Sequence, residues 1–266
     1  MDFFKNSGSY PEAEFLQGRE ADRLQQLIDF DYDEICDTYS ETYAYYALSH
    51  NIILKLASKL LTGCKISPQI IKLLNRGQNK LKHTPPLSDM NALLSFYIVY
   101  DAKEGSGAKT IAEGLLLSMG VPPPAEAKHA IKNCMNSRWG IYEYWECIDT
   151  HNFTVKELAT DKVFTILQPL GYIGKKGDLL MFRLLPSLTP VDTAVAVGAP
   201  FLLSGNSKQE WLDFLHEQDV VGGKKTEEQL VILFKKGPRF GYWIDFFLSL
   251  SGITATHYIV KGLPKQ

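Results

Sequence analysis

Hydrophobic positions in the first half of the chain repeat with the period of an α-helix. The clearest stripe runs over residues 41–62 and ends at Gly63, a residue suited to the left-handed conformation of a helix C-cap. Residues 88–101 are apolar on nearly every side, and the helices predicted around them favour a buried helix over a buried strand. Further helices are predicted at 12–30, from Ser67-Pro68 onward, at 109–119 and at 124–136.

The period of the pattern changes at Ser137. Short segments rich in Val, Ile, Tyr, Phe and Trp follow and are separated by turn residues, which is the pattern of β-strands. These segments are 141–149, 152–158, 162–168, 179–185 and 194–203. Short turns between them predict a meander that closes into a barrel-like sheet. The segment 179–185 is apolar on both faces, so we expect it between the barrel core and a layer of helices.

The pattern returns to helices near 207–217, 226–236 and 239–250, with one more strand at 254–260. The predicted fold class is therefore α+β. We expect a helical domain over 1–137, a small five-stranded antiparallel barrel-like module over 138–206, and a C-terminal helical segment over 207–266 that packs back on the rest.

Charge is unevenly distributed along this chain of 266 residues, although its formal net charge is only −2. Residues 1–50 carry eleven acidic and three basic side chains, whereas residues 51–84 carry seven basic and no acidic ones. The two segments are expected to neutralise each other in a helix–helix contact. The alternative is an exposed basic surface that attracts an acidic partner.

The four cysteines show none of the paired spacings that zinc sites or redox motifs require. Cys36, Cys64, Cys134 and Cys147 are expected to be reduced thiols, as is typical of a cytoplasmic protein. The first residues lack the apolar core of a signal peptide. The most apolar late stretch, Gly241 to Gly252, is too short to span a bilayer. We therefore predict no membrane insertion, no metal and no cofactor.

Sequence signatures of catalysis are also missing. The segment Gly105 to Thr110 resembles a phosphate-binding loop, but its glycine and lysine have the wrong spacing. It is expected to be a turn in which Thr110 caps the following helix. Neither a Gly-x-Ser-x-Gly nor a His-Glu-x-x-His motif occurs, so no catalytic residues are predicted.

Two groups of residues could contact a partner. Lys72, Arg76 and Lys80 recur every four residues on one face of a predicted helix, a spacing that can follow phosphates. Tyr142, Tyr144 and Trp145 form an aromatic strand, and tyrosine and tryptophan are enriched at binding hot spots. Each group also has a purely structural interpretation, as a solvated helix face and as barrel core respectively.

Four stretches carry a family resemblance: Leu94–Asp101, Lys109–Glu113, Ser137–Glu143 and Gly177–Pro186. Their order and spacing resemble an uncharacterised bacterial domain, often found upstream of cysteine-rich SEC-C metal-binding motifs, over residues 90–215. That family has no agreed activity, so the resemblance implies no catalytic residues. Because no cysteine follows Cys147, the zinc-binding role of its relatives is not expected in this chain.

The sequence thus predicts a non-catalytic cytoplasmic interaction or accessory protein that binds a protein partner. The alternative is a nucleic-acid-associated protein of regulation or of a CRISPR-type defence system, acting through the basic helix. An enzyme of unknown class is the third possibility.

Overall fold

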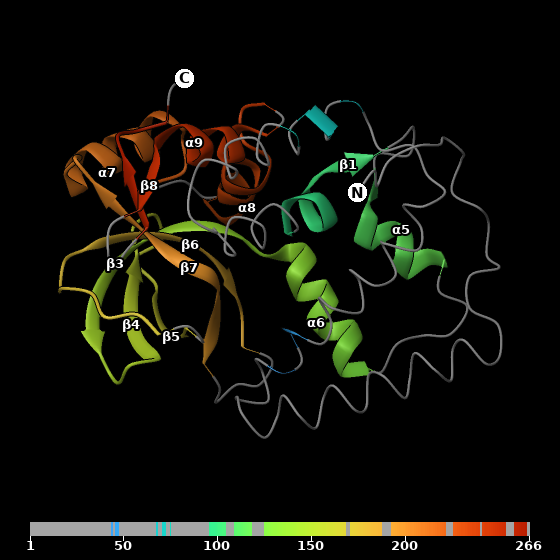
Figure 1. Ribbon diagram of the computed structural model, residues 1–266, viewed down its shortest axis with the longest axis horizontal. Coiled ribbons are helices and arrows are strands. Elements are labelled where there is room, and N and C mark those ends of the chain that lie inside the picture. The colour runs from blue at the N-terminus through green and yellow to red at the C-terminus, as the bar shows by residue number, and fades with distance from the viewer. Residues whose placement is uncertain are drawn as a thin grey trace. The chain divides into compact units, whose positions relative to one another are not determined.

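The computed structural model is shown in Figure 1. It describes residues 96–104, 109–118, 125–168, 171–187, 193–221, 226–239, 241–253 and 258–264, with isolated positions between 44 and 75. These residues divide into two compact units, and the boundary falls between Asn136 and Ser137. Most of the helices predicted before residue 88 lie outside the described residues.

The described part of the first unit is mainly helical. Residue Phe96 leads into a π-helix, η1 (Tyr97–Asp101), so the described end of the apolar segment 88–101 is helical. A two-stranded hairpin follows, made of β1 (Lys103–Glu104) and β2 (Lys109–Thr110). The helices α5 (Ile111–Ser118) and α6 (Ala125–Asn136) complete it.

Thr110 caps helix α5, as predicted. The backbone N–H of Thr110 donates to Oε2 of Glu113 at 2.6 Å, and the backbone N–H of Glu113 donates to Oγ1 of Thr110 at 3.2 Å. These reciprocal bonds form a capping box, which satisfies N–H groups that the first turn of a helix leaves without partners.

The second unit begins with five strands that form a closed barrel. They are β3 (Arg138–Cys147), β4 (Asn152–Glu157), β5 (Val163–Leu167), β6 (Leu179–Leu185) and β7 (Ala194–Ser204). Their order is β5-β4-β3-β6-β7, and a pairing of β5 with β7 closes the ring. All five strands begin and end within a few residues of the predicted bounds.

The barrel is not wholly antiparallel, which corrects the prediction. The closing pair is parallel and joins Ile166 to Ala194 and Leu167 to Val195. Strand directions cannot alternate around a closed ring that has an odd number of members. A five-stranded barrel must therefore contain at least one parallel pair, and here it is the pair that closes the ring.

Aromatic side chains fill the barrel. The rings of Tyr142 and Phe182 stack with centroids 4.3 Å apart, and those of Tyr144 and Phe153 stack at 5.2 Å. The other buried members of this core are Val155, Ile166, Tyr172, Leu180, Ala194 and Ala196. Burying large aromatic side chains supplies most of the hydrophobic stabilisation that such a small barrel can have.

The C-terminal segment provides both helices and strands. The helices are α7 (Lys208–Glu217), α8 (Thr226–Val231), its π-helical continuation η2 (Ile232–Lys236), and α9 (Tyr242–Leu250). Two strands follow, β8 (Ser251–Ile253) and β9 (Tyr258–Lys261). Strand β9 pairs with β7 and β8 pairs with β9, so the sheet continues beyond the barrel to seven strands. Strand β8 was not predicted.

The C-terminal helices gather on one side of the barrel (Figure 1). The ring of Phe247 on α9 lies 4.6 Å from that of Trp139 on β3 and 4.6 Å from that of Phe201 on β7. Strand β6 is buried on both faces, as predicted: Leu180 and Phe182 face the barrel core, and Met181 and Arg183 are buried on the opposite face.

Candidate functional site

The aromatic residues predicted as one contact group on β3 do not share a surface. Tyr142 and Tyr144 are buried in the barrel core, whereas Trp145 is 42% exposed. This corrects the predicted group, because successive side chains of a strand point to opposite faces. Trp145 is the member of the group that a partner can reach.

The outward side of β3 changes from covered to open along its length. Trp139 and Ile141 are buried, Glu143 is half-buried, and Trp145 is exposed. The ammonium of Lys208, the first residue of α7, pairs with Oε2 of Glu143 at 2.7 Å. The helical cover therefore ends at Glu143, and Trp145 lies immediately beyond it.

A β-bulge places Trp145 at this position. Tyr144 pairs with Val155 and Glu146 with Thr154, so Trp145 has no partner of its own in the ladder between β3 and β4. A bulge locally increases the twist of a strand and redirects the side chains there. Trp145 is thereby held outward while its neighbour Tyr144 remains in the core.

The outward side chains of β3, β4 and β5 beside Trp145 form a surface that we call the barrel face. The paired residues Glu143, Lys156 and Val163 form one row across the three strands. Glu146, Thr154 and Thr165 form the next row. Besides Trp145, its members are Glu146, Thr154, Lys156, Val163 and Thr165. Val163 is 52% exposed, so the face presents two large apolar side chains among polar ones.

The end of the barrel next to this face is formed by the β3–β4 hairpin and the loop after β5. The carboxylate of Asp149 accepts hydrogen bonds from the backbone N–H groups of His151 and Asn152 at 2.7 and 2.8 Å. These bonds, together with the side chain of Asn152, lower the pKa of Asp149. The backbone N–H of Tyr172 donates to the carbonyl of Thr150 at 3.0 Å, which ties the loop to the hairpin.

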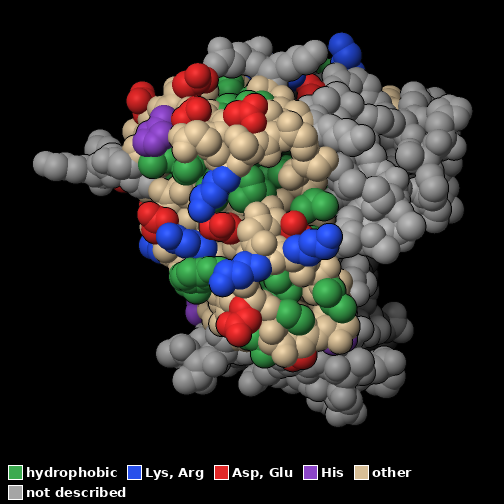
Figure 2. Space-filling model, turned by 90° about the vertical axis from the view of Figure 1, so that its left-hand side faces the viewer, with side chains coloured by type: hydrophobic (Ala, Val, Ile, Leu, Met, Phe, Trp, Pro, Cys, Tyr) green, Lys and Arg blue, Asp and Glu red, His purple; other side chains and the backbone are tan. Residues whose placement is uncertain are grey.

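Exposed aliphatic residues lie on both of these segments. Ile148 is in the hairpin and Ile173 follows Tyr172 in the loop, and both are more than half exposed. Lys175 and Lys176 continue the loop and are also exposed. Figure 2 shows hydrophobic, basic and acidic side chains interspersed over this side of the molecule.

This region carries no excess of positive charge. Between Glu143 and Asp178 the chain has four lysines and, apart from the buried Glu157, five carboxylates. The ammonium of Lys156 pairs with Asp161 at 2.7 Å. Proteins that bind nucleic acid through its phosphates need a basic surface. The charge of the barrel face is thus that of an ordinary protein surface.

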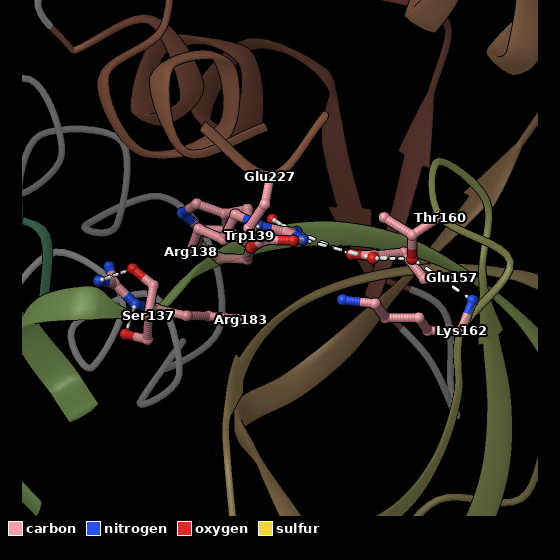
Figure 3. Close-up of polar contacts among 8 residues, drawn as sticks. All are labelled: Ser137, Arg138, Trp139, Glu157, Thr160, Lys162, Arg183 and Glu227. Carbon is pink, nitrogen blue, oxygen red and sulfur yellow. Dashed lines mark hydrogen bonds and ion pairs between the residues drawn. The ribbon is translucent and has the colours of Figure 1, made fainter. Parts of the chain in front are cut away.

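A second polar cluster lies at the opposite end of β3 and is drawn in Figure 3. The guanidinium of Arg138 contacts two carboxylates from different elements. Its Nη1 donates to Oε1 of Glu157, at the end of β4, at 2.7 Å, and its Nε donates to Oε1 of Glu227, on α8, at 3.1 Å. Thr160 Oγ1 also donates to Oε2 of Glu157, at 2.5 Å.

The contacts within this cluster shift the pKa values of Arg138 and Glu227 in favour of their charged forms. Burial alone would lower the pKa of Arg138, but its hydrogen bonds and ion pairs with Glu157 and Glu227 raise it above its usual value. Partial burial would raise the pKa of Glu227, but Arg138 and the nearby Lys162 lower it. Arg138 and Glu227 therefore stabilise each other's ionised forms.

A second buried arginine joins the start of the barrel to β6. Arg183 donates from Nε to Oγ of Ser137 at 2.7 Å and from Nη2 to the carbonyl of Ser137 at 2.8 Å (Figure 3). Sequence reasoning missed both Arg138 and Arg183. The available signal was an arginine inside a strand that is otherwise apolar, since a buried arginine needs partners.

The predicted basic row is described at one position only. Lys72 is exposed and helical, whereas Arg76 and Lys80 lie outside the described residues. Neither Cys134, which is buried, nor Cys147, which is exposed, forms a disulfide, and Cys36 and Cys64 lie outside the described part.

Among the described residues, no group of three or more His, Cys, Asp or Glu side chains is placed to hold a metal ion. No helix within the described segments has the length and apolar character needed to cross a membrane.

No family model, curated protein or solved structure matches this chain. The resemblance to the domain found upstream of SEC-C motifs therefore stays a prediction. Function has to be argued from the barrel face and its surroundings.

Proposed function

We propose that this protein is a non-catalytic interaction or accessory protein of the cytoplasm that binds a protein partner through the barrel face. The observation that carries the proposal is the position of Trp145 just beyond the helical cover, 42% exposed on a strand whose other aromatic residues are buried. A large aromatic side chain left in water is unfavourable. Tryptophan is also the residue type most enriched at binding hot spots.

The composition around Trp145 supports a protein partner. Protein interfaces have an aromatic or aliphatic centre within a polar rim of both charges. Trp145 and Val163 are the apolar members of the barrel face, and Thr154, Thr165, Glu146 and Lys156 surround them. Ile148 and Ile173 are further exposed aliphatic side chains, in the hairpin and the loop at the adjoining end of the barrel.

The alternative function, nucleic-acid association in regulation or CRISPR-type defence, receives less support from this surface. The strand order of the barrel is that of OB-type barrels, in which the corresponding face binds oligonucleotides. A fold does not determine its ligand, however, and five carboxylates outside the core accompany four lysines here. This alternative thus depends on the predicted basic row of Lys72, Arg76 and Lys80.

A photo-crosslinking experiment tests the proposal. A photoreactive phenylalanine analogue replaces Trp145 in the full chain, and this variant is expressed in the organism from which the protein comes. The matched control places the analogue at Ile232, which is 55% exposed on η2 in the same unit. We expect an adduct at residue 145 whose size does not change on nuclease treatment, with none at residue 232.

Two results would contradict the proposal. Residue 145 could crosslink no more than residue 232, which would make Trp145 an ordinary surface residue. Alternatively, the adduct at residue 145 could be digested by nuclease, which would favour the nucleic-acid alternative.

A further inference from the structure

The guanidinium of Arg138 has one permanent and one replaceable partner. Glu157, the permanent partner, is 2% exposed and binds the Nη1 and Nη2 edge at 2.7 and 3.3 Å. Glu227 binds the Nε and Nη2 edge at 3.1 and 3.2 Å, and its side chain is 59% exposed. Each carboxylate therefore forms two hydrogen bonds, the arrangement for which arginine is best suited.

Arg138 does not need Glu227 for its neutralisation. It is only 10% exposed, and Glu157 already supplies one full negative charge beside it. An ion pair in which one side chain is largely exposed contributes little to stability. Glu227 lies in the first turn of α8, which continues into η2, and its side chain is largely exposed, so its removal from Arg138 requires only the movement of that side chain.

The outer edge of Arg138 would attract an anion if Glu227 moved away. Of the two carboxylates that contact Arg138, Glu157 alone would then remain, beside the positive charges of Arg138 and Lys162. Figure 3 shows the side chain of Lys162 extending towards the cluster. The edge that Glu227 now occupies offers Nε and Nη2 in the plane of a fork, which matches the two oxygens of a carboxylate.

We propose that the outer edge of Arg138 is a carboxylate-binding site, which Glu227 occupies in place of an external carboxylate. The site takes one carboxylate, held by Nε and Nη2 of Arg138 with Lys162 nearby, while Glu157 holds the guanidinium in position from the buried side. Helix α8 then acts as an intramolecular competitor. This site is separate from the barrel face and does not depend on the function proposed for it.

The test uses the full chain with Glu227→Ala and Glu227→Gln, which vacate the edge, and Glu228→Ala as the matched control on the same helix. Glu228 is exposed on α8, next to Glu227. The probe is sodium acetate, compared with sodium chloride at equal ionic strength. The readout is the NMR signal of the Nε–H group of Arg138, assigned through the Arg138→Lys variant.

We expect acetate to shift this signal saturably in both Glu227 variants, with at least tenfold weaker binding in the wild type and in Glu228→Ala. Two peptides then distinguish the sources of the carboxylate: one has an internal glutamate and an amidated C-terminus, and the other has glutamine and a free C-terminus. Binding of either peptide supports the site and identifies its source.

The proposal is overturned if acetate shifts the Arg138 signal of the Glu227 variants no more than chloride does. It is overturned equally if the wild type and the Glu227 variants respond alike, because Glu227 would then not compete. Loss of the folded state in both Glu227 variants, seen by far-ultraviolet circular dichroism, would also overturn it, since Glu227 would then be a permanent part of the ion network.

Discussion

The ring of Tyr142 folds back along β3 and covers Gly140, two residues earlier on the same face of the strand. A Cβ atom added at Gly140 would lie 2.8 Å from Cε2 of Tyr142 and closer still to its hydroxyl. The absence of a side chain at residue 140 thus provides the space that a fully buried tyrosine occupies.

Gly140→Ala is expected to destabilise the second unit by about 1–3 kcal/mol, because the added methyl group overpacks a core that cannot yield easily. Urea unfolding followed by tryptophan fluorescence measures this, since all four tryptophans, Trp139, Trp145, Trp211 and Trp243, lie in that unit. The control repeats the substitution in a Tyr142→Val background, where the cost should shrink. An equal cost in both backgrounds would disprove the steric explanation.

Truncation of two neighbouring residues on β3 should destabilise the protein to very different extents. Tyr144→Ala removes a buried ring that stacks on Phe153, and we expect a loss of about 3–5 kcal/mol. Trp145→Ala should change the free energy of unfolding by only about 0.5 kcal/mol, because its ring is exposed. Urea unfolding followed by circular dichroism gives both values. A large loss from Trp145→Ala would mean that this side chain belongs to the core.

The two carboxylates beside Arg138 should differ in their importance for stability. Glu157→Ala leaves a buried guanidinium with too little compensating charge, which costs about 3–5 kcal/mol. Glu227→Gln should cost no more than about 1 kcal/mol, because Glu227 is largely exposed. The same denaturation experiment compares them. Equal losses would show that the cluster acts as one unit with no replaceable partner.

The contribution of Glu227 should also depend on pH. Partial burial acts to raise its pKa, but Arg138 and Lys162 lower it below the ordinary value of 4.5. A lowered pKa in the folded state means that ionisation favours folding. The wild type should therefore be more stable than Glu227→Gln above pH 4.5, and this difference should vanish as the pH falls through the lowered pKa. Melting temperatures across an acid series provide the measurement, and a pH-independent difference would contradict it.

High pH should destabilise the folded protein through a tyrosine of the barrel core. Burial, together with the nearby Cys147, raises the pKa of Tyr144 to about 12. The unfolded chain ionises this tyrosine near its ordinary pKa of 10, so the folded state loses stability as the pH rises above 10. Tyr144→Phe removes that loss and should unfold at higher pH than the wild type. Identical alkaline unfolding of the two proteins would argue against it.

The local elements of the second unit could be predicted because each has a local cause. The five strands are short β-rich segments between turns. Helix α7 is preceded by its N-cap, Ser207, whose hydroxyl accepts from the backbone N–H of Glu210 at 3.2 Å while its own backbone N–H donates to Oε2 of Glu210 at 2.6 Å. Alternation along β3 also indicates that Trp145 points away from Tyr144, which argues against a single contact group of the three aromatic residues.

Long-range features left no such local signal. The parallel pairing of β5 with β7 follows from closing a ring of five strands, and no residue in either strand indicates it. Arg138 and Glu227 are 89 positions apart, so their contact depends on the completed fold. The edge of the helical cover, which decides the exposure of Trp145, likewise depends on where Lys208 meets Glu143.

Because β7 closes the barrel, the aromatic side chains of β3 can be buried only late in the synthesis of the chain. When β3, β4 and β5 leave the ribosome, β7 and helix α9 have not yet been made, so neither face of β3 has its final cover. The side chains of Tyr142, Tyr144 and Trp139, which are buried in the folded protein, therefore stay exposed to water while the later strands and helices are still being synthesised. The contact of Trp139 with Phe247 can form only after residue 247 has been added, so the outer aromatic layer of β3 is among the last parts of the fold to be completed.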